Sequence, residues 1–222
     1  MNNHTNPSII ALLILSLVGL LLVIQFGIIT VTFEKLGVSP TGATRLLLGS
    51  MIGSLINLPL FSLKTDIPRQ ETDSWHYLFL GLSPRQDFSR TIIAINVGGG
   101  VIPVAFSLYL FIALDLHIAD VMFVGGIVAL VSYLFSRPVK GMGIMMPILV
   151  APLAAALAAM MINQPQSAPL AYIGGTLGVL VGADLLRIMD VRQLRAPIAS
   201  IGGAGTFDGV FLTGIIAVLL TG

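Results

Sequence analysis

The amino-acid sequence predicts an all-α integral membrane protein with about seven transmembrane helices, and three observations support this fold class. Of the 222 residues, 56% are hydrophobic and only 9% are charged, whereas a typical soluble domain has about 25% charged residues. The mean hydropathy is +0.99. The 24 glycines and 12 prolines fall within apolar runs, where membrane helices tolerate them. Too few charged side chains remain to cover a surface that faces water.

Seven apolar runs approach the roughly 20 residues that a helix needs to cross the hydrocarbon core. In chain order the predicted spans are Ile9–Phe33, Thr44–Leu63, Thr91–Leu114, Ile118–Phe135, Gly143–Ile162, Ala168–Leu186 and Thr206–Thr221. The fourth and seventh are short, so six or eight crossings stay open. Because Met1–Ser8 has no Lys or Arg, we interpret the first run as a retained span and not a signal peptide. Residues 1–222 are thus expected to form a single polytopic transmembrane domain.

The basic residues indicate which side of the membrane each connector occupies. If the chain crosses seven times, nine of its 11 Lys and Arg residues lie on the side of the amino terminus. These nine are Lys64, Arg69, Arg85, Arg90, Arg137, Lys140, Arg187, Arg192 and Arg195. The opposite side has Lys35 and Arg45, with Asp115 and Asp120 near its second connector. Since cytoplasmic loops carry an excess of Lys and Arg, we expect the amino terminus inside and the carboxyl terminus outside.

The connector Lys64–Arg90 is one of two long connectors. It contains Trp75, His76 and Tyr77, and because Trp and Tyr favour the membrane interface we predict a segment lying at the cytoplasmic face. No second His stands near His76, and neither a metal site nor a cofactor is predicted. The net charge of +1 and the lack of a long basic run argue against nucleic acid as a partner. The lipid bilayer is the predicted partner.

Two aspartates near the cytoplasmic ends of the last two spans are the candidate catalytic residues. Asp184 lies close to the end of the sixth span, and Asp208 lies at the start of the seventh. Each is about three residues, or about 4.5 Å, from the predicted membrane boundary. Because the two spans meet at one connector, both carboxylates are expected at similar depth. Charged groups inside spans tend to be functional.

Glycines on both spans predict that the two helices approach closely, because small residues at four-residue steps let helix backbones meet. The glycines at four-residue steps are Gly174, Gly178 and Gly182 in the sixth span and Gly205 and Gly209 at the start of the seventh, with Gly203 before them as a supporting residue. Two carboxylates in contact would share a proton. One could then activate a water molecule while the other donates to a carbonyl oxygen. Structural roles stay open, since Asp208 can cap a helix and Asp184 can pair with Arg187.

The third span carries a competing feature. It contains Asn96, Gly98, Gly99, Gly100 and Pro103, which favour a broken helix or the close crossing of another helix. Transporters build binding sites from such breaks. The alternative function is therefore a small-solute or ion transporter or channel that uses Asn96, the three glycines and Asp120. A second alternative is a non-catalytic membrane scaffold in which backbone groups or Arg187 satisfy both aspartates.

Several segments resemble known families. The runs Ile173–Leu186 and Ile201–Gly214, together with Asn96–Val104 and Ser136–Pro138, resemble an uncharacterised prokaryotic membrane family, a domain of unknown function. This resemblance covers nearly the whole chain and implies a prokaryotic plasma membrane. A more distant similarity is to the presenilin and signal-peptide-peptidase group of intramembrane aspartyl proteases. It implies that Asp184 and Asp208 are the catalytic pair and that the substrate is a membrane protein.

Overall fold

The structure is a computed structural model that describes residues 16, 27–28, 30–65, 90–139, 143–193, 196–203 and 209–221. The chain divides into two compact units, Met1–Arg45 and Leu46–Gly222. In the first unit the described residues include a helical stretch at 30–35 and the start of helix α2 (Pro40–Gly53). The predicted first span and most of the connector Lys64–Arg90 lie outside the described residues. All candidate site residues belong to the second unit.

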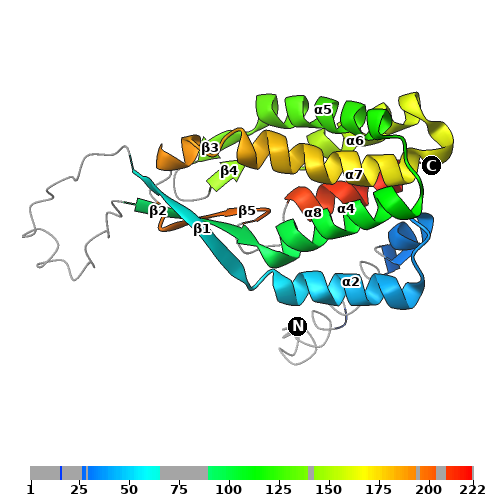
Figure 1. The fold of residues 1–222 in the computed structure, drawn as a ribbon, viewed down its shortest axis with the longest axis horizontal. Helices are drawn as coiled ribbons and strands as arrows, with labels where there is room; N and C mark the ends of the chain where they lie inside the picture. The colour runs from blue at the N-terminus through cyan, green and yellow to red at the C-terminus, as the bar shows by residue number, and fades with distance from the viewer. Residues whose placement is uncertain are drawn as a thin grey trace, which may run out of the picture. The chain divides into compact units, whose positions relative to one another are not determined.

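Helices make up most of the second unit. The described helices after α2 are α4 (Ile102–Ala113), α5 (Ile118–Phe135), α6 (Val150–Ile162), α7 (Ser167–Val179) and α8 (Gly209–Leu220). Helix α7 is the central one, because it contacts the other four and eleven of its 13 residues are buried. It runs antiparallel to α8, whose end lies at the marked carboxyl terminus (Figure 1).

A small sheet adjoins one end of these helices. Its strands lie in the order β1 (Asn57–Lys64), β2 (Arg90–Asn96) and β5 (Ile198–Ile201). Strand β1 is antiparallel to β2, whereas β5 is parallel to it. A hairpin of β3 (Arg137–Val139) and β4 (Gly143–Met145) lies at the same end (Figure 1). Ile93, Val191 and Ile201 form a buried apolar cluster there, against which Ile144 of β4 packs.

Two π-helical segments join the sheet to the helices. The first, η1 (Val97–Val101), links β2 to α4, and the second, η3 (Leu180–Leu185), continues α7. The short 3₁₀-helix η4 (Asp190–Gln193) follows. In a π-helix each backbone bond spans one residue more than in an α-helix, and such segments are frequent at functional sites. Both π-helical segments contain residues that the sequence marked as candidates.

The structure corrects three of the predicted spans. Helix in the second predicted span ends at Gly53, and Asn57–Lys64 is a strand. The third span begins as strand β2, and the fifth begins as β4 before its helix starts at Val150. A window of apolar residues measures hydropathy and does not separate a buried strand from a helix. The isoleucine-rich sequence of β2 favours the strand, because β-branched side chains pack well on a pleated surface.

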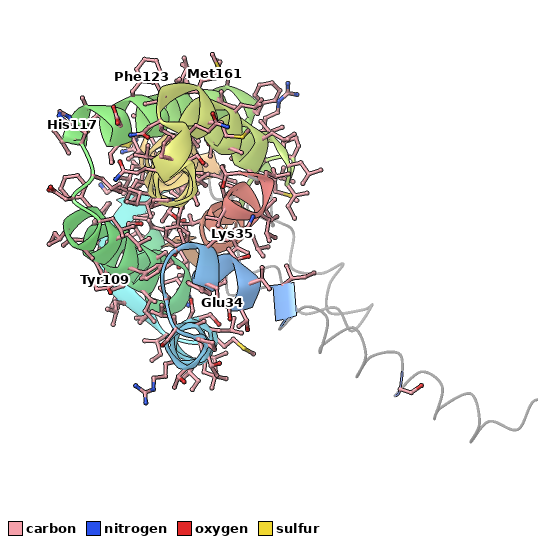
Figure 2. The ribbon with its side chains drawn as sticks, turned by 90° about the vertical axis from the view of Figure 1, so that its right-hand side faces the viewer. Glu34, Lys35, Tyr109, His117, Phe123 and Met161 are labelled. Carbon is pink, nitrogen blue, oxygen red and sulfur yellow. The ribbon has the colours of Figure 1, made fainter. Side chains whose placement is uncertain are left out.

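Two helices of the described part, Ile118–Phe135 and Gln164–Leu185, are long and apolar enough to cross a membrane. The first has a mean hydropathy of 2.1, yet only 28% of it is buried. Phe123 of α5 and Met161 of α6 are 54% and 85% exposed and point away from the helices (Figure 2). The remaining apolar helices of the described part have 10–17 residues. The fold is therefore mostly helical with a small sheet, and it contains two clear candidates for membrane spans.

Candidate functional site

The candidate site lies where the carboxyl ends of the parallel strands β2 and β5 meet the helices. Each strand runs into a glycine-rich segment, Gly98–Gly100 after β2 and Gly202–Gly203 after β5. Gly202 and Gly203 have φ angles of 75° and 129°, which favour glycine because side chains with a Cβ clash in this region. The register of the two strands brings both glycine segments to the same end of the sheet.

Asn96 fixes the first glycine segment. Its side-chain oxygen accepts a hydrogen bond from the Gly99 amide at 2.7 Å. Its side-chain nitrogen donates to the Ser54 carbonyl oxygen at 2.7 Å and to Asn57 Oδ1 at 3.1 Å. Asn96 is only 1% exposed. Its amide therefore caps η1 and ties β2 to the segment that follows α2, which is a structural task.

The other glycines of this segment permit close packing of backbones. The Ser50 hydroxyl donates to the Gly98 carbonyl oxygen. A Cβ on Gly98 would overlap the backbone of Ser50 and Ser54, and a Cβ on Gly99 would overlap the carbonyl oxygen of Gly202. The three glycines thus fit between α2 on one side and the Gly202 turn on the other. The predicted break in the third span is present, and it takes the form of a strand followed by a π-helix.

Asp184 reaches the second glycine segment. It is half-buried in η3, and its Oδ2 accepts a hydrogen bond from the Gly202 amide at 2.7 Å. This hydrogen bond holds the Asp184 carboxyl group against the Gly202 turn. Gly202 stands six residues before Asp208 in the sequence. Asp208 and Gly205 lie outside the described residues, whereas Gly203 and the backbone of Gly209 lie within them.

The glycine stripe of the sixth span packs against a helix other than the predicted one. A Cβ on Gly174 or Gly178 would meet Val124 or Val128 of α5, and a Cβ on Gly182 would overlap the Ala129 carbonyl oxygen. The stripe therefore serves the contact with α5 and not the predicted contact with the last helix. Helical periodicity identifies the face that packs closely, but it does not identify the neighbour.

Close packing between α7 and α8 occurs on another face. A Cβ on Gly175 would lie 3.2 Å from Thr213 Cγ2, and a Cβ on Gly214 would lie 2.8 Å from Thr176 Oγ1. The predicted approach of the last two helices is therefore present, although different glycines make it. Asp184 follows on the same helix, beyond the point where α7 turns into the π-helical segment η3.

Arg187 is engaged with α5 and with Asp190. Its guanidinium donates to Ser136 Oγ at 3.0 Å and to the Tyr133 carbonyl oxygen at 2.7 Å. It also pairs with Asp190 at 2.9 Å and lies 4.5 Å from the centre of the Tyr133 ring. Cations at a helix carboxyl terminus satisfy its last carbonyl groups. This residue thus fastens the end of α5 to the segment after Asp184.

Asp120 lies apart from the other candidates. It belongs to the first turn of α5, and Asn163 Nδ2 approaches its Oδ2 at 3.4 Å. Helix α4 has 12 residues, about 18 Å, and separates this end from the Asn96 end (Figure 1). The structure does not bring Asp120 and Asn96 together. Among the described residues no group of three or more His, Asp or Glu gathers in a way that could hold a metal ion.

Sequence reasoning missed the partners of the Asn96 cluster. Asn57 Oδ1 accepts hydrogen bonds from Asn96 and, at 2.6 Å, from the Ser200 hydroxyl. Ser50 and Ser54 complete the cluster from α2 and the turn after it. The available signal was the spacing of Ser50, Ser54 and Asn57 within an otherwise apolar run, since buried polar groups need partners.

Comparison with known proteins identifies the family to which this chain belongs. The family model described as "Protein of unknown function (DUF1614)" matches residues 51–220, a range that includes the whole candidate site. No curated protein and no solved structure matches the chain. The predicted membership of an uncharacterised family is confirmed, whereas the similarity to presenilin finds no support in these comparisons. Because the match covers most of the sequence, the chain belongs to the DUF1614 family.

Proposed function

We propose that this protein is a multi-span membrane protein with a hydrolytic site of the aspartyl-protease type, in which Asp184 and Asp208 form the acid–base pair. The observation that carries the proposal is the contact of the Asp184 carboxylate with the Gly202 amide at 2.7 Å. This contact ties Asp184 to the glycine-rich segment that leads to Asp208. One carboxylate would take a proton from water as the water oxygen adds to the scissile carbonyl carbon, and the other would donate a proton to the carbonyl oxygen. The C–N bond would then break as the first carboxyl group gives its proton to the leaving nitrogen.

Membrane insertion is supported by the apolar residues that the helices expose. Leu130 and Leu134 of α5 are each 60% exposed, and Leu157 of α6 is 56% exposed. Large exposed apolar patches are rare on monomeric soluble proteins. We retain several crossings, with the amino terminus inside a prokaryotic plasma membrane, as part of the proposal. The charge asymmetry of the sequence supports this orientation.

The position of Asp184 in its helix fits a site that water can reach. The helix Gln164–Leu185 has 22 residues, about 33 Å, and Asp184 is the residue before its last. A hydrocarbon core of about 30 Å would then end near Asp184. Open strand edges do not occur within the lipid hydrocarbon, so β1, β2 and β5 would lie at or beyond the same boundary. Water needed for hydrolysis would be available at that depth.

The first test uses the purified full-length protein in lipid nanodiscs and a set of single-span peptides as substrates. Asp184→Asn and Asp208→Asn should each lower the cleavage rate by at least about 100-fold, because general acid–base catalysis typically contributes 10²–10⁴-fold. Mass spectrometry of the products gives the rate. Asp120→Asn is the matched control, since Asp120 lies at the other end of α5, and it should cleave at the wild-type rate.

A photoreactive peptide with a hydroxyl group in place of the scissile carbonyl provides a second readout. Transition-state analogues bind far more tightly than substrates, so this probe should label the wild type and the Asp120→Asn variant but neither of the other two variants. Cleavage that persists in Asp184→Asn would refute the proposed acid–base pair.

A non-catalytic scaffold is the second candidate, and the same hydrogen bond favours it. A purely structural Asp184 would also be expected to accept a hydrogen bond from a backbone amide. The scaffold predicts that wild-type protein is neither labelled by the probe nor able to cleave any peptide. For the transporter alternative we find no favouring observation among the described residues, because the donors of the Asn96 amide are already used and Asp120 lies at the far end of α4.

A further inference from the structure

A continuous chain of contacts runs from Asn96 to Asp184. Asn96 Oδ1 accepts the Gly99 amide at 2.7 Å, and Asp184 Oδ2 accepts the Gly202 amide at 2.7 Å. Between these two hydrogen bonds the glycine segments touch each other. A Cβ on Gly202 would lie 2.6 Å from the backbone nitrogen and Cα of Gly100. The two glycine segments are therefore in close backbone contact.

The first part of this chain is held in place from several sides. Both donors of the Asn96 amide are used, by Ser54 and Asn57, and the Ser50 hydroxyl holds Gly98. Closely packed interiors transmit displacement and do not absorb it. We therefore expect a shift of Gly99 to move Gly202, and with it the amide that donates to Asp184.

We infer that Asn96 is a positioning residue for Asp184. Through Gly99 and Gly202 it fixes the backbone donor that occupies one carboxylate oxygen of Asp184, so that the other oxygen keeps a defined direction. The catalytic consequence of this inference rests on the proposed function. The positional claim concerns the Gly202 amide alone and can be measured without any activity.

The experiment follows the Gly202 amide by NMR in the full-length protein, with isotope-labelled glycine and lipid nanodiscs. An amide proton that donates to a carboxylate forms a strong, short hydrogen bond and resonates downfield. The Gly202 amide signal is assigned by its loss in Gly202→Ala. The Asp184→Ala variant gives the chemical shift of this amide proton in the absence of the carboxylate, which is its reference position. Gly99→Ala should move the signal upfield towards that position. Gly126→Ala, whose Cβ would meet no described atom within 4 Å, should leave it unchanged.

Two further variants keep the inference testable if Gly99→Ala does not fold. Asn96→Ser retains an acceptor for the Gly99 amide, because a serine hydroxyl caps helices in the same way, and it should keep the downfield signal, whereas Asn96→Leu should lose it. A merely structural Asn96 would give the same Gly202 signal in both variants. An unchanged Gly202 signal in folded Gly99→Ala protein, or equal signals in the two Asn96 variants, overturns the inference.

The same samples separate this inference from the proposed function. If the probe and the peptides fail with the wild type while the Gly202 signal responds to Gly99→Ala, the hydrolytic function fails and the positioning role stands. If the hydrolytic function and the positioning role both hold, Gly99→Ala should also lower probe labelling at least tenfold. The probe should label the Gly126→Ala variant as strongly as the wild type.

Discussion

Single glycines decide how closely the backbones of this protein approach, and they do so at specific neighbours. A Cβ on Gly182 would overlap the backbone of Ala129, whereas a Cβ on Gly126, in the same partner helix, would have no described neighbour within 4 Å. The two positions therefore form a natural pair for measuring the energetic value of one missing methyl group.

We predict that Gly182→Ala lowers the free energy of unfolding by about 1–3 kcal/mol, the usual cost of overpacking. Gly126→Ala should leave it unchanged or raise it by up to about 1 kcal/mol, because alanine has the higher helix propensity. Reversible unfolding in mixed detergent micelles measures both values. Equal effects of the two substitutions would show that the contact with Ala129 is not tight.

At this scale the sequence was informative about residue types and less so about their partners. It marked Asn96, the three glycines after it and Asp184 as unusual, and the structure brings these residues to one junction. It could not show that Asn96 serves Gly99, or that the stripe ending in Gly182 faces α5. Such pairings depend on tertiary contacts between segments that are far apart in the chain.

Helix α5 is fastened at its carboxyl end by Arg187, and two serines near that end differ in their use. Ser136 Oγ accepts a hydrogen bond from Arg187 Nε at 3.0 Å. The hydroxyl of Ser132 is buried and has no hydrogen-bond partner among the described residues. Ser136 thus supports the contact between α5 and the segment after Asp184, whereas the Ser132 hydroxyl makes no such hydrogen bond in the described part of the chain.

We expect Ser136→Ala to destabilise the protein by about 1.5–3 kcal/mol, the range for hydrogen bonds to charged groups. Ser132→Ala should be neutral or stabilising, since it removes a buried hydroxyl that lacks a partner in the described part of the chain. Thermal unfolding of the two variants side by side gives the comparison. A larger loss for Ser132→Ala than for Ser136→Ala would contradict this assignment.

The elements themselves could be predicted from the sequence only in part. The fourth span agrees with α5 in its bounds, and the sixth agrees with α7 and η3 within about one residue. Where apolar runs continue into strands, as at β1 and β2, hydropathy alone gave helices. Strand pairing between β2 and β5 joins residues that are more than 100 positions apart, and no local pattern encodes that contact.

On the scale of the second unit, charge is distributed unevenly between its two ends. Lys64, Arg90 and Arg137 belong to the strands at one end. Asp115 and Asp120 lie at the other end, beside the turn between α4 and α5. The proposed orientation would place the end with the strands at the cytoplasmic face, and it stays a prediction.

Because the chain has no cysteine, single cysteines can report this orientation without background. His117→Cys and Arg137→Cys flank α5 on its two sides. We predict that an impermeant thiol reagent labels the first from outside intact cells and the second only after the membrane is permeabilised. Labelling of both positions from the same side would show that α5 does not cross the bilayer.

The lengths of the helices have a consequence for the lipid around the protein. Helices α6 and α8 have 13 and 12 residues, about 18–20 Å, against a hydrocarbon thickness of about 30 Å. Beside a short hydrophobic segment a bilayer thins, at a cost of fractions of a kcal/mol per Å. α5, with 18 residues, matches the bilayer more closely than these two helices do. Of the two short helices, α6 exposes Leu153, Leu157 and Met161, whereas most of α8 is buried. Once inserted, the protein would therefore be surrounded by lipid that is thinnest beside α6.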